Sequence, residues 1–257
     1  MKSNKIKYLH VVCYKWGTKY PADYVNILYA MVRRHLSIPH TFHCITDDSR
    51  KLRSDIVVHE LPDVGVDGIW RKLMSFQANF LDLQDEFIVS FDLDVVIVDS
   101  LDFLGEWPEK TFIIGRNWSR GPDAARASGT LYRLKVGSHS FIWDRFIINP
   151  EEAIDTFHGK NRLIGEQNWL NANIEGFDFF PSGKIVSFKR HCRAKGHVLP
   201  GKIGERIGFS TAIFGKASVP NAAAVISFHG DPLPPDVMSG RCGRWRHAPF
   251  VKEYWHE

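Results

Sequence analysis

The segment FIVSFDLDVVIV, residues 87–98, decides the fold class and the position of the expected site. It places two carboxylates, Asp92 and Asp94, between two apolar runs of strand length. Residues i and i+2 of an extended chain face the same side, so both carboxylates can reach one cation. Their oxygens suit hard cations such as Mg²⁺ and Mn²⁺, whereas two close carboxylates repel each other when no cation or proton intervenes. We therefore expect a metal site here, with a solvated acidic turn as the weaker alternative.

Apolar segments of strand length alternate with segments of helical period on both sides of this stretch. Helices are expected at residues 21–36 and 69–80. Strands are expected at residues 6–13, 40–46, 55–61, 86–91, 95–98, 111–115, 129–134, 184–188 and 224–228. This pattern is typical of an α/β fold with a mainly parallel central sheet and helices on both faces. Ligands of such sheets gather beyond the carboxyl ends of the strands.

Length and composition restrict the class of protein further. The chain of 257 residues fits one large domain or at most two small ones, and a net charge of +4 is too small to indicate a nucleic-acid partner by itself. Its four cysteines form no CxxC pair, which argues against a zinc knuckle or a disulfide framework. The first apolar run is too short for a signal peptide, and no segment reaches the ~20 apolar residues of a spanning helix. We expect a cytoplasmic protein.

Several polar residues follow the expected strands. Lys15, Gly17 and Tyr20 come after the first strand, and Asp47 and Asp48 end the second. Together they suit a nucleotide, with an aromatic ring for the base and carboxylates for the base edge or the ribose. For any one of these residues, ordinary loop packing is the alternative.

Two further residues bear on the aspartate pair. Lys72 opens the second expected helix and can bind phosphate or pair with Asp92; solvent exposure is the alternative. His229 follows a β-branched strand and precedes Gly230, so its imidazole can be a third metal ligand, one that favours Mn²⁺. Its alternative is a loop histidine that caps backbone groups.

Haloacid-dehalogenase-like phosphatases also carry Asp-x-Asp after an apolar strand. In that family the motif lies near the chain start and is followed by Gly-Thr. Here 91 residues precede the motif, and Val95 and Val96 follow it. The phosphatase therefore remains the weaker alternative.

An ordered set of motifs resembles GT-A glycosyltransferases, in particular bacterial retaining enzymes of the family-8 type found with surface-polysaccharide genes. The segments that carry the resemblance are IWRKLMSF (69–76), FDLDVVIVDS (91–100), SGTLYRL (128–134), GEQNWLN (165–171) and ISFHG (226–230). The resemblance implies one Rossmann-like GT-A domain over residues 1–257. Residues 1–94 would form the nucleotide-binding half, and residues 95–257 the half that binds acceptor and sugar.

The resemblance also implies an activity: metal-dependent sugar transfer, with retention, from a UDP-sugar to a saccharide or glycolipid acceptor. The metal, Mn²⁺ or Mg²⁺, would be held by Asp92, Asp94 and His229. Glu166, Gln167 and Asp94 would be the catalytic residues. The residues expected at the nucleotide sugar are Lys15, Gly17, Tyr20, Asp47, Asp48, Lys72, Asp92 and Leu93.

Two positions depart from the family pattern. Leu233 occupies the place of a lysine that contacts the diphosphate, and Glu166 replaces an aspartate. We expect Arg241 and Arg244, or the segment 193–195, to supply the missing cation. The same basic clusters also suit peripheral contact with the anionic inner face of the membrane. A nucleotide-sugar-binding protein without activity is the remaining alternative.

Overall fold

A computed structural model of the chain describes residues 5–117, 126–158, 165–192 and 215–257. The chain forms two compact units, each built from several segments. Unit 1 comprises Met1–Asn26, Ser37–Leu93 and Asp102–Phe180, and unit 2 comprises Ile27–Leu36, Asp94–Leu101 and Pro181–Glu257. The boundary between them falls between Leu93 and Asp94, inside the Asp-x-Asp segment.

Unit 1 is built on a seven-stranded sheet with the order β3-β2-β1-β4-β7-β6-β8. The strands are β1 Leu9–Lys15, β2 His40–Thr46, β3 Val57–Glu60, β4 Phe87–Phe91, β6 Phe112–Arg116, β7 Ala127–Lys135 and β8 Asp178–Phe179. Strands β3, β2, β1 and β4 are parallel, β7 runs antiparallel to β4 and β6, and β8 is parallel to β6. The mainly parallel α/β sheet expected from the sequence is therefore confirmed.

The register of the three central strands positions the site. Cys13 of β1 pairs with Cys44 of β2 on one side and with Phe91 of β4 on the other. Because these strands are parallel and end at similar levels, the residues that follow them meet at one edge of the sheet. Asp92 comes directly after β4 at this edge.

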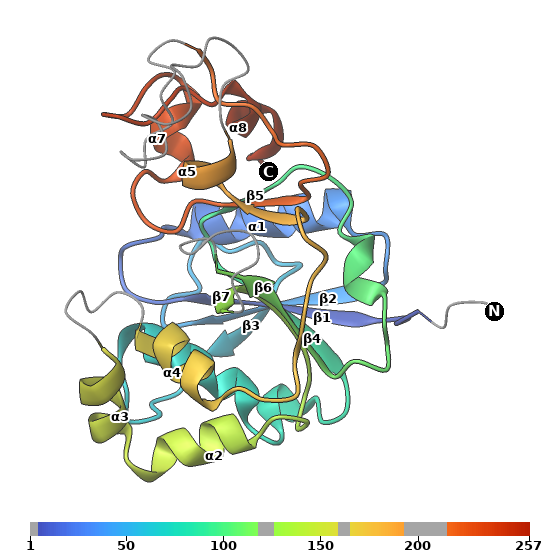
Figure 1. Cartoon of the computed structure of the whole chain (residues 1–257), viewed down its shortest axis with the longest axis vertical. Helices are drawn as coiled ribbons and strands as arrows, with labels where there is room; N and C mark the ends of the chain where they lie inside the picture. Colours follow the sequence, from blue (N-terminus) through green and yellow to red (C-terminus); the bar gives the residue numbers. More distant parts are fainter. Residues whose placement is uncertain (1–4, 118–125, 159–164, 193–214) are drawn as a thin grey trace. The chain divides into compact units, whose positions relative to one another are not determined.

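One face of this sheet is covered by helices that the sequence did not indicate. They are α2 Phe141–Ile148, α3 Pro150–Phe157 and α4 Gly165–Asn173, which lie on the same side of the sheet in Figure 1. In the core beneath them, the Trp70 and Phe146 rings are stacked with centroids 5.4 Å apart. Helix α1, Ala22–His35, was expected from the sequence, and its residues belong to both units.

The second expected helix, at residues 69–80, takes a different form. It is a 3₁₀ helix, η1 Gly68–Phe76, followed by a separate short turn, η2 Phe80–Asp82. Six of the nine η1 residues are buried, so the segment has no solvent-facing stripe that would favour the α-helical period. Its packing against α2, α4 and the sheet determines its conformation.

Unit 2 contains its own three-stranded sheet. Strand β10 Val225–Ser227 lies between β5 Val95–Ile97, to which it is antiparallel, and β9 Ile185–Ser187, to which it is parallel. The short helices of this unit are α5 Phe188–His191, α7 Pro234–Met238 and α8 Pro249–Tyr254. All three strands were expected, but their separation into a second sheet was not. In the described ranges, no helix is long and apolar enough to cross a bilayer.

Candidate active site

Lys72, Asp92 and Glu166 form a compact charged group in unit 1, here called the lysine cluster. The Lys72 Nζ donates to Asp92 Oδ1 at 2.5 Å and to the Gly129 carbonyl at 3.0 Å. It also lies 3.9 Å from Glu166 Oε1. The three side chains come from η1, from the end of β4 and from α4, so tertiary packing brings them together. Of the two roles expected for Lys72, the structure shows the pairing with Asp92.

The electrostatics of the lysine cluster follow from its burial. Lys72 is 5% exposed and Glu166 is 4% exposed. Burial lowers the pKa of Lys72, but the Asp92 and Glu166 carboxylates more than offset this and raise it overall. Burial raises the pKa of Glu166 to about 7, although Lys72 acts in the opposite direction. Glu166 can therefore hold or release a proton near neutral pH.

Local features of β7 and α4 make this arrangement possible. A Cβ atom at Gly129 would lie 2.7 Å from Glu166 Oε1, so glycine leaves the room that the carboxylate occupies. Helix α4 is fixed to β7 by Asn171, which accepts from the Ala127 N–H at 2.8 Å and donates to its carbonyl at 3.0 Å. Gln167, on the same helix, is half-buried, and its carbonyl accepts from the Asn171 amide. Glu166 thus belongs to a helix that is hydrogen-bonded to β7.

The expected nucleotide loops meet at the carboxyl ends of β1 and β2. Lys15 Nζ donates to the Asp48 carbonyl at 3.2 Å, and the Gly17 N–H donates to Asp47 Oδ2 at 2.8 Å. Asp48 is also bound by the Arg50 guanidinium, whose hydrogen bonds hold the pKa of this carboxyl far below its usual range. Arg50 was not expected from the sequence.

Tyr20 and Leu93 are the other two residues of this region that were expected to contact the nucleotide. The Tyr20 ring is half-buried and lies 5.0 Å from the Tyr24 ring. Leu93 is 3% exposed, so its side chain belongs to the core, and only its backbone can face a ligand. For both residues, contact with a nucleotide stays a prediction.

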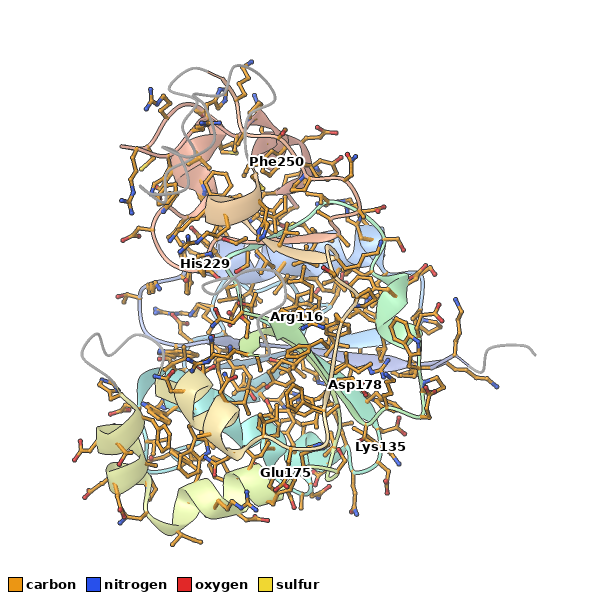
Figure 2. The ribbon with its side chains drawn as sticks, in the orientation of Figure 1. Arg116, Lys135, Glu175, Asp178, His229 and Phe250 are labelled. Atoms are coloured by element: carbon orange, nitrogen blue, oxygen red, sulfur yellow. The ribbon has the colours of Figure 1, made fainter. Side chains whose placement is uncertain are left out.

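Asp94 and His229 belong to unit 2, where the pairing of β5 with β10 brings their segments together. The Phe228 N–H donates to the Asp94 carbonyl at 2.9 Å, and the Gly230 N–H donates to Asp94 Oδ2 at 3.1 Å. Asp94 is buried, whereas His229, labelled in Figure 2, is exposed. The His229 Nε2 lies 2.5 Å from the buried Ser187 Oγ. Ser187 is a partner that the sequence did not indicate.

The expected metal ligands match a divalent cation in their chemistry. Asp92 and Asp94 offer oxygen donors and His229 a nitrogen donor, a set that suits Mn²⁺. In the parts of the chain that the structure describes, no three His, Cys, Asp or Glu side chains are gathered closely enough to hold a metal. Residues 92–94 lie between two strands rather than within one, so the strand rule used above does not apply to them. Convergence on one metal stays a prediction.

Leu233, which occupies the place of the family lysine, lies in a region that the structure describes in part. The Leu233 N–H donates to Asp236 Oδ2 at 2.8 Å at the start of α7. Arg241 and Arg244 are exposed. The segment 193–195, the other expected source of a cation, lies outside the described residues.

Comparisons with known proteins place this architecture. No model of a known protein family matches the chain, and no curated protein matches its sequence. Solved structures do match. The galactosyltransferase LgtC, in complex with donor and acceptor sugar analogs, shares 12% identity over 88% of each chain, with a TM-score of 0.52. An active-site mutant of LgtC gives 0.59 at 12% identity, over 95% of this chain and 94% of the other. The chain has the GT-A fold.

A larger enzyme shares this fold as well. The glycosyltransferase GlyE of Streptococcus pneumoniae TIGR4 matches with a TM-score of 0.60 and 9% identity, over 88% of this chain and 56% of its own. The expected fold resemblance is therefore confirmed, and the phosphatase alternative is not favoured. At identities of 9–12% the likeness concerns the fold, and the activity must be argued from the residues.

Proposed function

We propose that the chain is a metal-dependent glycosyltransferase that moves a sugar from a UDP-sugar to a saccharide or glycolipid acceptor, with retention, in bacterial surface-polysaccharide synthesis. The observation that carries the proposal is the lysine cluster at the carboxyl edge of a GT-A sheet. Lys72 holds the Asp92 carboxylate at the strand end while Glu166 stays poised to exchange a proton. This combination of a fixed carboxylate and a titrating one suits group transfer better than simple binding.

The nucleotide would occupy the loops after β1 and β2. The Asp47 carboxylate there is held by the Gly17 N–H, and the Lys15 ammonium fixes the Asp48 backbone. A rigid, polar loop pair of this kind can accept hydrogen bonds from a base or a ribose. Tyr20 beside it offers a ring on which a base can stack.

The metal would be held by Asp92, Asp94 and His229, and it would supply a Lewis acid for the diphosphate leaving group. In this arrangement the Asp92 carboxylate would bind the metal while it accepts from Lys72. The Asp94 carboxylate would bind the metal while it accepts from the Gly230 N–H. The protein contacts fix the direction of each carboxylate, as outer contacts of a metal site commonly do.

Glu166 and Gln167 would act at the transferred sugar. A carboxyl group with a pKa of about 7 can donate a hydrogen bond to a sugar hydroxyl in one form and accept one in the other. Gln167 is not a base, but its amide oxygen can stabilise positive charge at the anomeric carbon. Lys72 keeps the carboxylates in place and balances their charge.

The test is metal-linked UDP binding together with donor turnover. We expect UDP to raise the melting temperature with Mn²⁺ present and to lose most of this effect in EDTA. Asp94→Asn should abolish transfer and donor hydrolysis, while the exposed neighbour Asp99→Asn serves as the matched control. Undiminished turnover in Asp94→Asn would refute the proposal.

A further inference from the structure

Three histidines form a row across one edge of the large sheet in unit 1. His10 of β1, His43 of β2 and His59 of β3 lie on the same face, as the register of these parallel strands requires. The His10 Nδ1 lies 3.0 Å from the His43 Nε2, and the His43 Nδ1 lies 2.9 Å from the His59 Nε2. These residues are named here the histidine row. Through both ring nitrogens of His43, the row joins three strands by side chains as well as by backbone pairing.

The hydrogen bonds of the histidine row limit how many protons it can hold. A neutral imidazole has one N–H donor and one acceptor nitrogen, so three neutral rings fill both contacts when every donor points the same way. One added proton also fits, because it can occupy an outer nitrogen, the His10 Nε2 or the His59 Nδ1. A second added proton must place N–H against N–H in one contact, and it puts two positive charges in the row. That contact then breaks.

Burial opposes the charged forms of the row. His43 is 6% exposed, and burial lowers its pKa to about 4, with the two neighbouring imidazoles acting in the same direction. Burial also lowers the pKa of His10 and of His59. In the described part of the chain, the charge outside the row that acts on it is Glu86, which precedes β4 and favours protonation of His10. The side chains beside the row on this face carry no charge at neutral pH; they are Tyr8, Val12, Thr41, Ile45, Val57 and Ile88.

Strand β3 has few other attachments to the sheet. It lies at the edge and pairs with β2 alone among the described strands. Val57 and Val58 are each 41% exposed, so they bury little apolar surface. Segments with few buried apolar contacts open at a lower free energy than the core of a sheet. Loss of the contact between His43 and His59 should therefore release β3 before the rest of the sheet.

We propose that His10, His43 and His59 form an acid-sensitive switch that holds the edge strand β3 in place and releases it when the row takes up a second proton. In the unfolded chain all three histidines bind protons near the ordinary value of pH 6.5, whereas the folded row excludes at least two of them. The contribution of the row to stability is thus present above pH 6.5 and is lost as the pH falls toward about 4. The proposal is independent of the proposed function, because none of the three residues is expected at the donor or the metal.

The first experiment uses the wild type alone and counts protons. The histidine resonances are followed by NMR from pH 7.5 to pH 5, in EDTA so that no transition metal binds the imidazoles. We expect the folded row to take up no more than one proton above pH 5, because a second one must break a contact. Two or three row histidines that titrate near pH 6.5 in the folded protein would overturn the proposal.

The second experiment measures the release of β3 by hydrogen exchange in the wild type and in His59→Gln. Exchange of the β3 amides is compared with that of the β1 amides in the same sample, which cancels the pH dependence of the chemistry. In the wild type, the β3 amides should lose protection relative to β1 as the pH falls from 7 to 5. In His59→Gln they should be less protected already at pH 7 and should change less with pH. Parallel changes in β3 and β1 of the wild type would contradict the assignment of the switch to β3.

Urea denaturation of His43→Gln gives the size of the effect. The matched control is His40→Gln, which removes a half-buried histidine of the same strand outside the row. The folding equilibrium constant of the wild type, divided by that of His43→Gln, should fall by about 10-fold between pH 6 and pH 5, since the wild type excludes at least one more proton. The same ratio for His40→Gln should change much less. A ratio for His43→Gln that stays constant over this range would refute the switch.

Discussion

The two aspartates of the FDLD segment are held by opposite means, although one residue separates them. In unit 1, the Asp92 carboxylate is bound by a buried lysine side chain that also faces the buried Glu166. In unit 2, the Asp94 carboxylate is bound by a backbone N–H of the loop that carries the exposed His229. In the first region the Lys72 ammonium contacts the carboxylate directly. In the second region a backbone N–H contacts the Asp94 carboxylate, a serine hydroxyl contacts the His229 ring, and the Lys189 ammonium interacts electrostatically with Asp94.

This difference predicts that the lysine cluster contributes mainly to the stability of the fold and that the region around Asp94 contributes mainly to ligand binding. Charges withdrawn from water depend on one another, so removing one of them leaves the others uncompensated and costs much of the folding free energy. The Asp94 carboxylate, which accepts from the Gly230 N–H, and the exposed His229 imidazole depend less on each other. Substitutions that remove charge from Lys72 or Asp92 should therefore lower the free energy of unfolding, and those around Asp94 and His229 should spare the fold and weaken ligand binding.

The largest effect is expected for Lys72→Met. It removes the ammonium between two carboxylates, and the free energy of unfolding should fall by about 3–5 kcal/mol. Urea denaturation measures this, with Lys252→Met as the control. The double variant Lys72→Met/Glu166→Gln should recover part of the loss. If the free energy of unfolding fell by less than about 1 kcal/mol, the lysine cluster would be solvated, and its contribution to stability would not differ from that of the region around Asp94.

The two aspartates provide the direct comparison. Asp92→Asn weakens a charge-assisted bond to a buried lysine and should lower the free energy of unfolding by about 1.5–3 kcal/mol. Asp94→Asn keeps a side-chain oxygen that can accept from the Gly230 N–H and should cost about 1 kcal/mol or less. Both should abolish donor turnover. Equal stability of the two variants in urea would contradict the distinction.

Glu166 should make stability depend on pH. Its pKa is raised in the folded state from the ordinary value of 4.5 to about 7, so the folded protein favours the protonated form. The contribution is fully present below pH 4.5 and is lost as the pH rises through about 7. We expect Glu166→Gln to lack this decline, a difference of a few kcal/mol between pH 4.5 and pH 8. Parallel pH profiles of wild type and variant, in denaturation and in kcat/KM, would contradict the assignment.

A similarly small effect on stability is expected at Ser187. Its hydroxyl contacts the His229 ring, so Ser187→Ala should cost about 1 kcal/mol of unfolding free energy. If His229 binds metal, loss of this orienting contact should weaken Mn²⁺ affinity by about 10-fold. Calorimetric titration with Mn²⁺ measures this, with the exposed Ser239→Ala as control. Unchanged Mn²⁺ affinity would remove His229 from the metal site.

Local sequence was sufficient for most strands and for the position of Asp92 after β4, but not for β8 or for the division into two sheets. The strands expected at residues 40–46 and 86–91 match β2 and β4 almost residue for residue. The signal is strongest for β4, because burial on both faces leaves a nearly continuous apolar run. The helices α2, α3 and α4 were missed, and η1 was expected as an α-helix. Their conformations depend on packing against the sheet rather than on their own periodicity.

The sequence by itself determined that Asp92 and Asp94 follow a buried strand, that Lys72 lies in the helical segment before that strand, and that loops rich in polar residues end β1 and β2. These facts depend on neighbours along the chain. Only the tertiary structure decided that Lys72 bridges Asp92 and Glu166 and that Asp94 belongs to a second sheet with β10. It alone brought the Lys189 ammonium to the Trp245 ring, because contacts between residues far apart in the sequence leave no periodic signal in a single sequence.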